Sequence, residues 1–440
     1  MAQPVDQVPG KAWVVTFAGT AINLCLGILY AWSVWGGKLV APKGADGKID
    51  QALIGTALSG LDSGWNYLSN AQVATPFSLC VIIFALLMIP GGRIQDKYGP
   101  KVGATVGGLF LAVGCIIAGL MKSYTGLIVG FGIFGGIGMG IGYAAPTPAA
   151  LKWFGPHKRG LIAGLVVGGY GGAALYIAPL AKTLIAAYGI SGSFIILGIG
   201  FAVVVIIAGQ LLAWPPAGYV PPGPPATATK AAAGAPVKTT LTAVDWTAGD
   251  MMKTWQFFAL VLMFIGTTQS GLLIIAFAAP LATPLLGASA WILVSFGGLI
   301  NALGRVGTGM YSDKIGRANA YTVNCIASAL CLFLLPWILA QQSVFLLFLA
   351  VGIAYWQYGG GLALMPSFTA DFFGAKNLGF NYGLVFIGWG LGFFMARLAG
   401  TIRDVTGNLN YAFYLSGIVL ILAVILARAA KRPSAVGETR

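Results

Sequence analysis

The chain has 440 residues, of which 58% are hydrophobic and only 8% are charged, and its mean hydropathy is +0.86. Because soluble domains carry about 25% charged residues, this composition excludes an ordinary soluble enzyme and predicts an integral membrane protein. The formal net charge of +14 does not indicate a nucleic-acid partner, since the basic residues are spread between hydrophobic segments.

Twelve segments are long and apolar enough to cross a bilayer, which takes about 20 residues. They cover residues 12–36, 71–91, 101–121, 124–147, 160–186, 192–214, 254–282, 288–311, 319–340, 343–370, 379–401 and 410–429. With both termini inside, seventeen Lys and Arg residues fall in inner segments and five in outer loops. Cytoplasmic segments are enriched in these residues, so the asymmetry predicts that both termini are cytoplasmic.

The first span carries Asn23, Gly27 and Tyr30 at helical spacing, so that one of its faces is small and polar. Packing against another helix and lining a binding site both explain this face. Residues 37–70 follow as an outer loop longer than most connections. The sequence assigns this loop no role.

A loop motif occurs twice, half a chain length apart. Gly92, Asp96 and Gly99 after the second span recur as Gly309, Asp313 and Gly316 after the eighth. Such spacing predicts two six-span halves related as internal repeats. We place these halves at 1–214 and 251–440. A Pro- and Ala-rich cytoplasmic linker, 215–250, joins them.

Arg305 lies inside the eighth span, where its charge is costly. A guanidinium does not lose its proton at accessible pH, and its burial near a bilayer centre costs from about 2.5 to about 17 kcal/mol. Asn301 lies one helical turn before it on the same face. This pair predicts a helix that binds an anion.

The repeated loops resemble the signature of the major facilitator superfamily. Further motifs are similar to those of its oxalate:formate antiporter and monocarboxylate transporter branch: Leu151-Lys152-Trp153-Phe154, Gly169-Tyr170-Gly171, Ala248-Gly249-Asp250-Met251, Tyr311-Ser312-Asp313-Lys314-Ile315-Gly316-Arg317 and Asn381-Tyr382-Gly383. The resemblance covers the chain apart from 37–70 and 215–240. It implies an all-α membrane protein with twelve transmembrane helices in two six-helix pseudo-repeat halves.

The resemblance also implies a binding site. A tyrosine at the position of Tyr143 contacts the substrate carboxylate in that branch, and we expect Arg305 to pair with the carboxylate through two charge-assisted hydrogen bonds beside Asn301. The rest of the wall is expected from Tyr30, Cys80, Tyr170, Tyr358, Phe386 and Trp389. Gating is expected from the inner-loop residues Asp96, Asp313, Arg93 and Arg317.

Two departures from the family pattern narrow the substrate. The oxalate:formate antiporter has a lysine where this chain has Trp389, so one fixed cation remains and a second carboxylate would be unpaired. This favours monocarboxylates such as lactate, pyruvate or acetate. Animal monocarboxylate transporters carry an aspartate at the position of Asn301, so that a proton would have to enter with the substrate. Exchange of one anion for another is the alternative to proton symport.

None of the eleven acidic residues lies well inside a span, and no metal-binding, catalytic or phosphate-binding motif occurs. We therefore expect no enzymatic activity, no metal and no cofactor. A nutrient sensor would need an added signalling region, and an anion channel would not need twin halves. The expected partners are a small carboxylate anion, a proton and the lipid bilayer of a plasma membrane, which in a bacterium is the inner membrane. We expect the protein to function as a monomer.

Overall fold

The protein is described here from a computed structural model that covers residues 8–44, 48–154, 159–216, 218–219, 221, 246–374 and 377–433. Its first group of helices consists of α1 (Gly10–Leu26), η1 (Gly27–Ala31), α2 (Trp32–Leu39), η2 (Gln51–Leu53), η3 (Gly60–Asp62), α3 (Asn70–Tyr98), α4 (Pro100–Met121), α5 (Tyr124–Gly126), η4 (Leu127–Gly135), α6 (Gly136–Tyr143), α7 (Pro146–Leu151), α8 (Arg159–Gly172) and α9 (Ala174–Leu211). Its second group consists of α11 (Ala248–Met251), α12 (Trp255–Leu286), η6 (Gly287–Ser289), α13 (Trp291–Ile315), α14 (Arg317–Ala340), α15 (Val344–Phe373), α16 (Leu378–Val385), α17 (Ile387–Leu391), α18 (Phe393–Thr406) and α19 (Asn410–Ala429). Across the described ranges, β structure is limited to isolated bridges in the loop before α3.

Eleven helical segments in the described ranges are long and apolar enough to cross a membrane. One of them, Gly164–Leu211, has 48 residues and contains two of the expected crossings. The chain turns back within it at Gly189, whose φ of 70° lies in the region that favours glycine. The protein is therefore a multi-pass integral membrane protein, and the expected fold of twelve transmembrane helices is confirmed.

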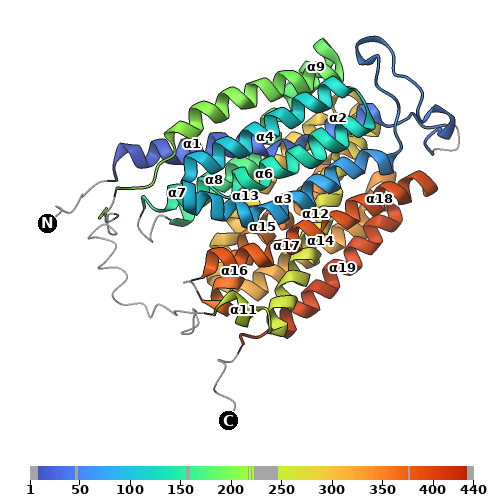
Figure 1. Cartoon of the computed structure of the whole chain (residues 1–440). Helices are drawn as coiled ribbons and strands as arrows, with labels where there is room; N and C mark the ends of the chain where they lie inside the picture. Colours follow the sequence, from blue (N-terminus) through green and yellow to red (C-terminus); the bar gives the residue numbers. More distant parts are fainter. Residues whose placement is uncertain are drawn as a thin grey trace.

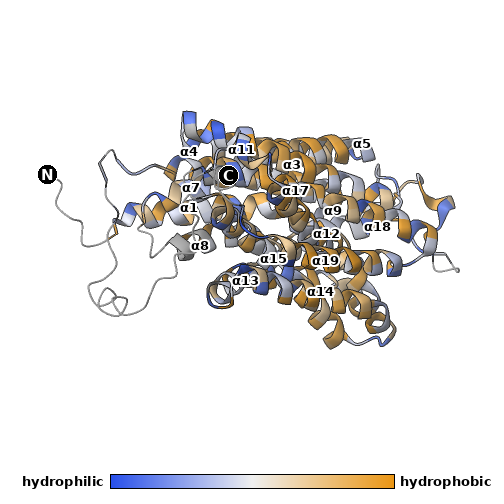
Figure 2. Cartoon of the chain, turned by 90° about the horizontal axis from the view of Figure 1, so that it is seen from below, coloured by the Kyte–Doolittle hydropathy of each residue, from blue (hydrophilic) through white to orange (hydrophobic). Residues whose placement is uncertain are grey.

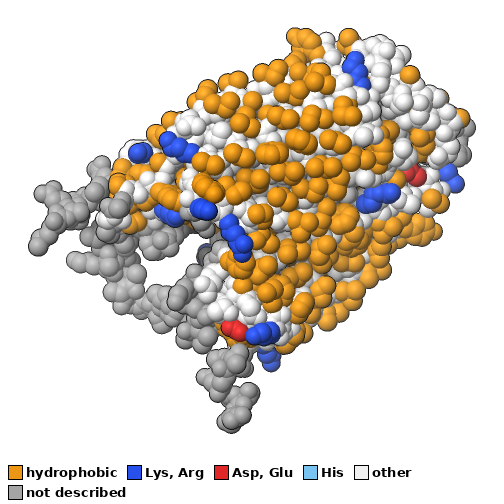
Figure 3. All heavy atoms as spheres, in the orientation of Figure 1, with side chains coloured by type: hydrophobic (Ala, Val, Ile, Leu, Met, Phe, Trp, Pro, Cys, Tyr) orange, Lys and Arg blue, Asp and Glu red, His pale blue; other side chains and the backbone are white. Residues whose placement is uncertain are grey.

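The long helices lie side by side in one bundle (Figure 1). Helix α1 begins and α19 ends at the same end of the bundle, which we call the termini end. The loop between α2 and α3 projects from the opposite end, which we call the loop end. Hydrophobic side chains cover the outer surface between these ends, and the Lys and Arg side chains lie mainly toward them (Figures 2 and 3). This is the surface expected of a bundle surrounded by lipid.

Each group packs mainly on itself, and the two groups meet along three seams. Helix α13 packs on α8 and α9, α3 packs on α17 and α18, and α12 packs on α2. Since α13 carries Arg305, the first seam brings the arginine against the first group.

Several spans depart from regular α-helix. In the first span, η1 is a tighter 3-10 segment that begins at Gly27, and a Cβ on this glycine would lie 2.5 Å from the Tyr170 carbonyl oxygen. The fourth span contains the π-helical segment η4, and the eleventh is divided into α16, α17 and α18. Such irregular segments often occur at functional positions. In the first span, the irregular segment carries Tyr30.

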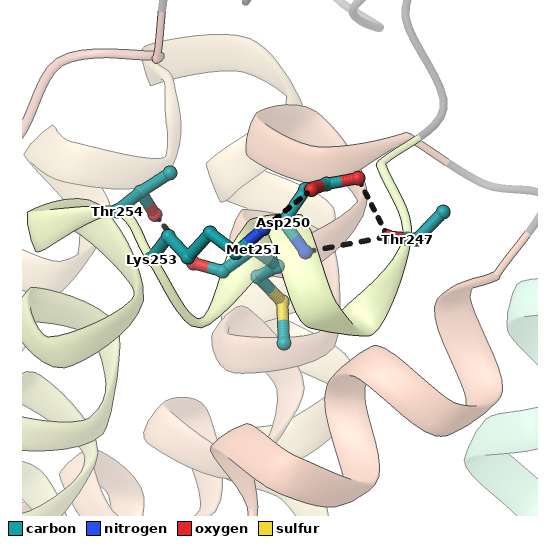
Figure 4. Close-up of polar contacts among 5 residues, drawn as sticks. All are labelled: Thr247, Asp250, Met251, Lys253 and Thr254. Carbon is teal, nitrogen blue, oxygen red and sulfur yellow. Dashed lines mark hydrogen bonds and ion pairs between the residues drawn. The ribbon is translucent and has the colours of Figure 1, made fainter.

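A short helix, α11, leads into α12 (Figure 4). The Thr247 hydroxyl accepts from the Asp250 backbone N–H at 3.2 Å and donates to its carboxylate at 2.7 Å, and Lys253 donates to the same carboxylate at 3.3 Å. These two side chains, Thr247 first, hold the pKa of Asp250 below its usual value. The Thr247 hydroxyl therefore caps α11, and the Asp250 carboxylate in the first turn of this helix is held by Thr247 and Lys253.

Trp246 fixes this segment to the second group. Its backbone N–H donates to the Phe373 carbonyl at 3.0 Å. Its own carbonyl accepts from the side-chain amides of Asn377, at 2.9 Å, and Asn381, at 3.2 Å. The segment that precedes α12 is thus tied to the ends of α15 and α16.

Glycines allow α4 and α6 to approach closely, and this contact is testable. A Cβ on Gly107 would lie 2.2 Å from the Gly142 backbone nitrogen. Gly107→Ala should therefore destabilise the folded protein by about 1–3 kcal/mol and lower its melting temperature in detergent. Gly200→Ala is the control, because a Cβ there meets nothing within 4 Å. Equal melting temperatures for the two variants would show that the close approach is absent.

Candidate functional site

Arg305 is 6% exposed and is held by three neutral acceptors. Its Nε donates to Asn301 Oδ1 at 3.3 Å, Nη1 to the Val167 carbonyl at 3.3 Å, and Nη2 to the Tyr30 hydroxyl at 3.2 Å. Among the acidic side chains that the structure describes, none pairs with this guanidinium. A buried charge without a counter-ion is costly, so Arg305 retains a strong attraction for an anion.

Asn301 is fully buried next to this guanidinium. Its Oδ1 accepts from Arg305, whereas its Nδ2 has no partner among the described residues. A buried donor left without an acceptor costs about 1–3 kcal/mol. The Asn301 amide is thus available to donate to a bound group beside Arg305.

A chain of hydrogen bonds runs from Arg305 across both groups of helices. The Tyr30 and Tyr358 hydroxyls lie 3.0 Å apart, and Trp389 Nε1 donates to the Tyr358 hydroxyl at 2.8 Å. Each hydroxyl has one hydrogen, and one of the two hydrogens joins the tyrosines. The other phenolic hydrogen is left for a further acceptor. Gly271 makes room for this arrangement, because a Cβ there would lie 2.3 Å from the Tyr358 ring.

Phe84 is a functional candidate that the sequence reasoning missed. Its ring centroid lies 4.8 Å from that of Trp389, 6.0 Å from Phe386, 5.5 Å from Tyr143 and 5.7 Å from Tyr170. It therefore joins aromatic side chains of both groups. Its position in the sequence, one turn after the expected wall residue at position 80 on the same face of α3, is a signal that could have found it.

Cys80 lies behind the aromatic wall. Its Sγ is 3.6 Å from the Met139 sulfur, and the Tyr170 hydroxyl donates to the same sulfur at 3.4 Å. Cys80 is fully buried. Its described polar contact is with Met139, so it supports Tyr170 rather than reaching Arg305.

The accessible side of the cluster faces the termini end. Tyr143, the last residue of α6, is partly exposed, whereas the other expected binding residues are buried. Its ring lies 5.1 Å from that of Tyr170, whose ring in turn lies 5.2 Å from that of Tyr30, a hydrogen-bond partner of Arg305. Tyr382 on α16, 5.7 Å from Phe386, is partly exposed as well. Both tyrosines lie toward the termini end of their spans.

Of the four expected gating residues, the structure describes the side chains of Arg93 and Arg317. The Arg93 guanidinium lies over the Phe380 ring at 5.4 Å, which joins α3 to α16. Arg317 Nε lies 3.7 Å from the Asp371 carboxylate, an acidic partner that the sequence did not indicate. The side chains of Asp96 and Asp313 lie outside the described residues, and their pairing stays a prediction.

Comparison with known proteins places the chain among membrane carriers. The sequence model described as Major Facilitator Superfamily matches residues 48–357. The oxalate:formate antiporter of Oxalobacter formigenes is 30% identical over 392 residues, which cover 84% of this chain and 87% of the antiporter. Monocarboxylate transporter 12 of Rattus norvegicus is 24% identical over 367 residues, which cover 78% of this chain and 74% of that protein. The partially occluded, inward-open xylose transporter XylE from E. coli has a similar fold, with a TM-score of 0.67 and 13% identity over 96% of this chain and all of that one.

The hydrogen bond between Tyr30 and Arg305 is testable without any ligand. Tyr30→Phe removes one of the three acceptors of a buried charge, and hydrogen bonds to charged groups are worth about 1.5–3 kcal/mol. We expect a melting temperature in detergent well below that of the unaltered protein. Tyr176→Phe is the control, because its hydroxyl donates only to the Leu24 carbonyl at the bundle surface. Equal losses in the two variants would show that Tyr30 is not a partner of Arg305.

Proposed function

The chain belongs to the major facilitator superfamily, and from this premise we propose that it is a secondary transporter of small monocarboxylates of the lactate and pyruvate type. The observation that carries this proposal is the buried Arg305 guanidinium, which has no acidic partner among the described residues. An anion that reaches it replaces long hydrogen bonds to neutral groups with a charge-assisted pair. Transport is proposed to occur by alternating access and without enzymatic chemistry.

The number of charges at the site favours one carboxylate. Arg305 offers the charge, and the Asn301 amide and one phenolic hydrogen of the Tyr30–Tyr358 pair offer two further donors. Trp389 adds no charge, because an indole is neutral. Its N–H already donates to the Tyr358 hydroxyl. A dianion would have a second carboxylate without a cation.

We propose that a proton accompanies the anion. The described side chains that surround Arg305 are neutral, so no carboxyl group there is available as a proton carrier. The proton would therefore travel with the carboxylate substrate. Both would enter from the side on which Tyr143 is partly exposed.

Binding at Arg305 acts on both groups of helices. Tyr30 belongs to the first group, and Arg305 and Tyr358 to the second. An anion that accepts hydrogen bonds from Arg305 or from the Tyr30–Tyr358 pair changes the hydrogen bonds between the two groups of helices. It shifts the balance between two conformations only if it binds one of them better. We propose that a bound anion favours the conformation in which the central cavity around Arg305 is closed.

The orientation and boundaries follow the same proposal. The halves are residues 1–214 and 251–440, with the cytoplasmic linker 215–250 between them. The termini end faces the cytoplasm, and Asp96, Asp313, Arg93 and Arg317 gate it. The protein works as a monomer in a plasma membrane, which in a bacterium is the inner membrane.

Exchange of organic anions is the second candidate, because a relative that is 30% identical is an oxalate:formate antiporter. Purified protein in proteoliposomes distinguishes the two. With an inward proton gradient and no internal anion, a symporter accumulates labelled lactate, whereas an exchanger takes it up only into vesicles preloaded with an anion. Acceleration by internal anion excludes a channel. The absence of lactate uptake under both conditions would contradict lactate transport, whether by symport or by exchange.

The role of Arg305 predicts that lysine cannot replace it. Arg305→Ala removes the buried charge partner, which costs about 2–5 kcal/mol, so the affinity for lactate should fall by roughly 30-fold or more. Arg305→Lys keeps the charge but loses the planar two-point fork, and should not restore this affinity. Arg397→Lys is the control, because Arg397 is exposed and donates to Thr401. Near-normal lactate affinity in Arg305→Lys would show that Arg305 only positions the helix.

Trp389 predicts the preference for one charge over two. Trp389→Lys places a second cation in the wall and should raise the affinity for oxalate relative to that for lactate. Trp389→Phe removes the same donor to Tyr358 without adding charge, and should not change this ratio toward oxalate. The measurement is competition of each anion against labelled lactate. Tighter binding of oxalate than of lactate to the unaltered protein would contradict the one-cation account.

A further inference from the structure

Asp404, near the end of α18, joins the two groups of helices at the loop end. Its Oδ1 accepts from the Asn70 backbone N–H at 2.9 Å and from the Asn70 side-chain amide at 2.8 Å. Its Oδ2 accepts from the Ala71 backbone N–H at 2.9 Å. Asn70 and Ala71 begin α3, whose first N–H groups have no partner inside the helix. A carboxylate suits this position, because it also meets the positive end of the helix dipole.

The backbones around this contact lie close together. A Cβ on Gly400, one turn before Asp404, would lie 2.8 Å from the Asn70 carbonyl oxygen. Lys43, in the loop after α2, donates to the Gly407 carbonyl at 3.3 Å and adds a second bond between the groups. A cavity of about 10 Å³ remains at this seam, lined in part by Arg403. This volume holds no more than about one water, so the helices meet closely at this seam.

Toward the termini end, a described contact between the two groups is the Arg93 guanidinium over the Phe380 ring, at 5.4 Å. The partial exposure of Tyr143 lies on the same side. In the described conformation, a carboxylate therefore joins the two groups at the loop end, whereas Tyr143 is partly exposed on the side of the termini end.

We propose that Asp404 is the latch that holds the loop end closed, and that its release from the first turn of α3 is required before this end can open. The inference rests on the proposed alternating access. It adds a residue that sets the balance between the two conformations and that lies far along α18 from the binding residues. Its three bonds join separate groups, so they exist in one conformation and must be absent in the other.

Asp62 offers a matched control. Its Oδ1 accepts from the Ile190 backbone N–H at 2.6 Å, also at the loop end, but both residues belong to the first group. Asp62→Asn removes the same carboxylate charge at a backbone N–H without touching the seam between the groups. It should lower stability and leave the conformational balance unchanged.

The test measures the distance between the groups at the loop end by pulsed electron spin resonance, without any ligand. Spin labels are placed at Ser59→Cys in the first group and Tyr411→Cys in the second, both exposed positions. Cys331 is replaced by Ala, and the other four native cysteines are buried. The parent protein should give one short distance. Asp404→Asn should add a longer distance. The fraction of molecules with the loop end open should rise roughly tenfold, because only the closed state loses hydrogen bonds to a carboxylate.

Asn70→Ala serves as a second variant in case Asp404→Asn folds poorly. It removes the side-chain bond and keeps both backbone bonds, so its open fraction should lie between those of the parent and Asp404→Asn. An unchanged distance in Asp404→Asn, or an equal shift in Asp62→Asn, would overturn the latch. A longer distance in Asp404→Asn together with no lactate uptake by the parent protein would instead contradict the proposed substrate and still support the proposed role of Asp404.

Discussion

The structure depends on a guanidinium that is buried without a carboxylate among the described residues. Arg305 cannot become neutral, so its surroundings must supply acceptors, and they do so with an amide, a hydroxyl and a backbone carbonyl. Gly171 leaves the space that the guanidinium fills, since a Cβ there would lie 3.1 Å from Arg305 Nε. These acceptors come from both groups of helices. The unsatisfied charge therefore sits at the seam that alternating access has to open and close.

Two ties between the groups have different characters. At the centre, the Tyr30–Tyr358 bond belongs to the chain of donors that an anion can rearrange. At the loop end, Asp404 makes a contact that no substrate touches. A transporter with both features can couple binding to movement, because the anion changes the first tie while the second sets the resting conformation. The conformational balance and the substrate preference are then separable properties of the chain.

The spans and the central pair were predictable because their signals are local. Hydrophobic runs give the crossings, and Arg305 with Asn301 one turn earlier is visible as a polar pair within such a run. The contacts of Phe84 and Asp404 could not be predicted, because they depend on how α3 packs against α17 and α18. Likewise, the sequence indicated Trp389 as a wall residue, but only the structure shows its N–H donated to Tyr358.

The neighbouring residues of span ten show the same limit. The sequence has Tyr355, Trp356, Gln357 and Tyr358 in succession, and composition does not say which one faces the site. The Tyr358 hydroxyl is linked to Arg305 through the Tyr30 hydroxyl. The Gln357 amide instead donates to the Thr267 carbonyl at 3.0 Å and joins α15 to α12. The rotation of a helix about its axis decides this difference, and that rotation follows from packing.

The most direct test of the account compares lactate with its neutral isostere lactamide in calorimetric titrations of the purified protein. The two ligands have nearly the same shape, and only lactate carries a negative charge that can pair with Arg305. We expect lactate to bind at one site per chain and lactamide to bind at least roughly 30-fold more weakly, as expected for a lost charge pair. Equal affinities would show that the guanidinium does not recognise the anion, and would contradict the account.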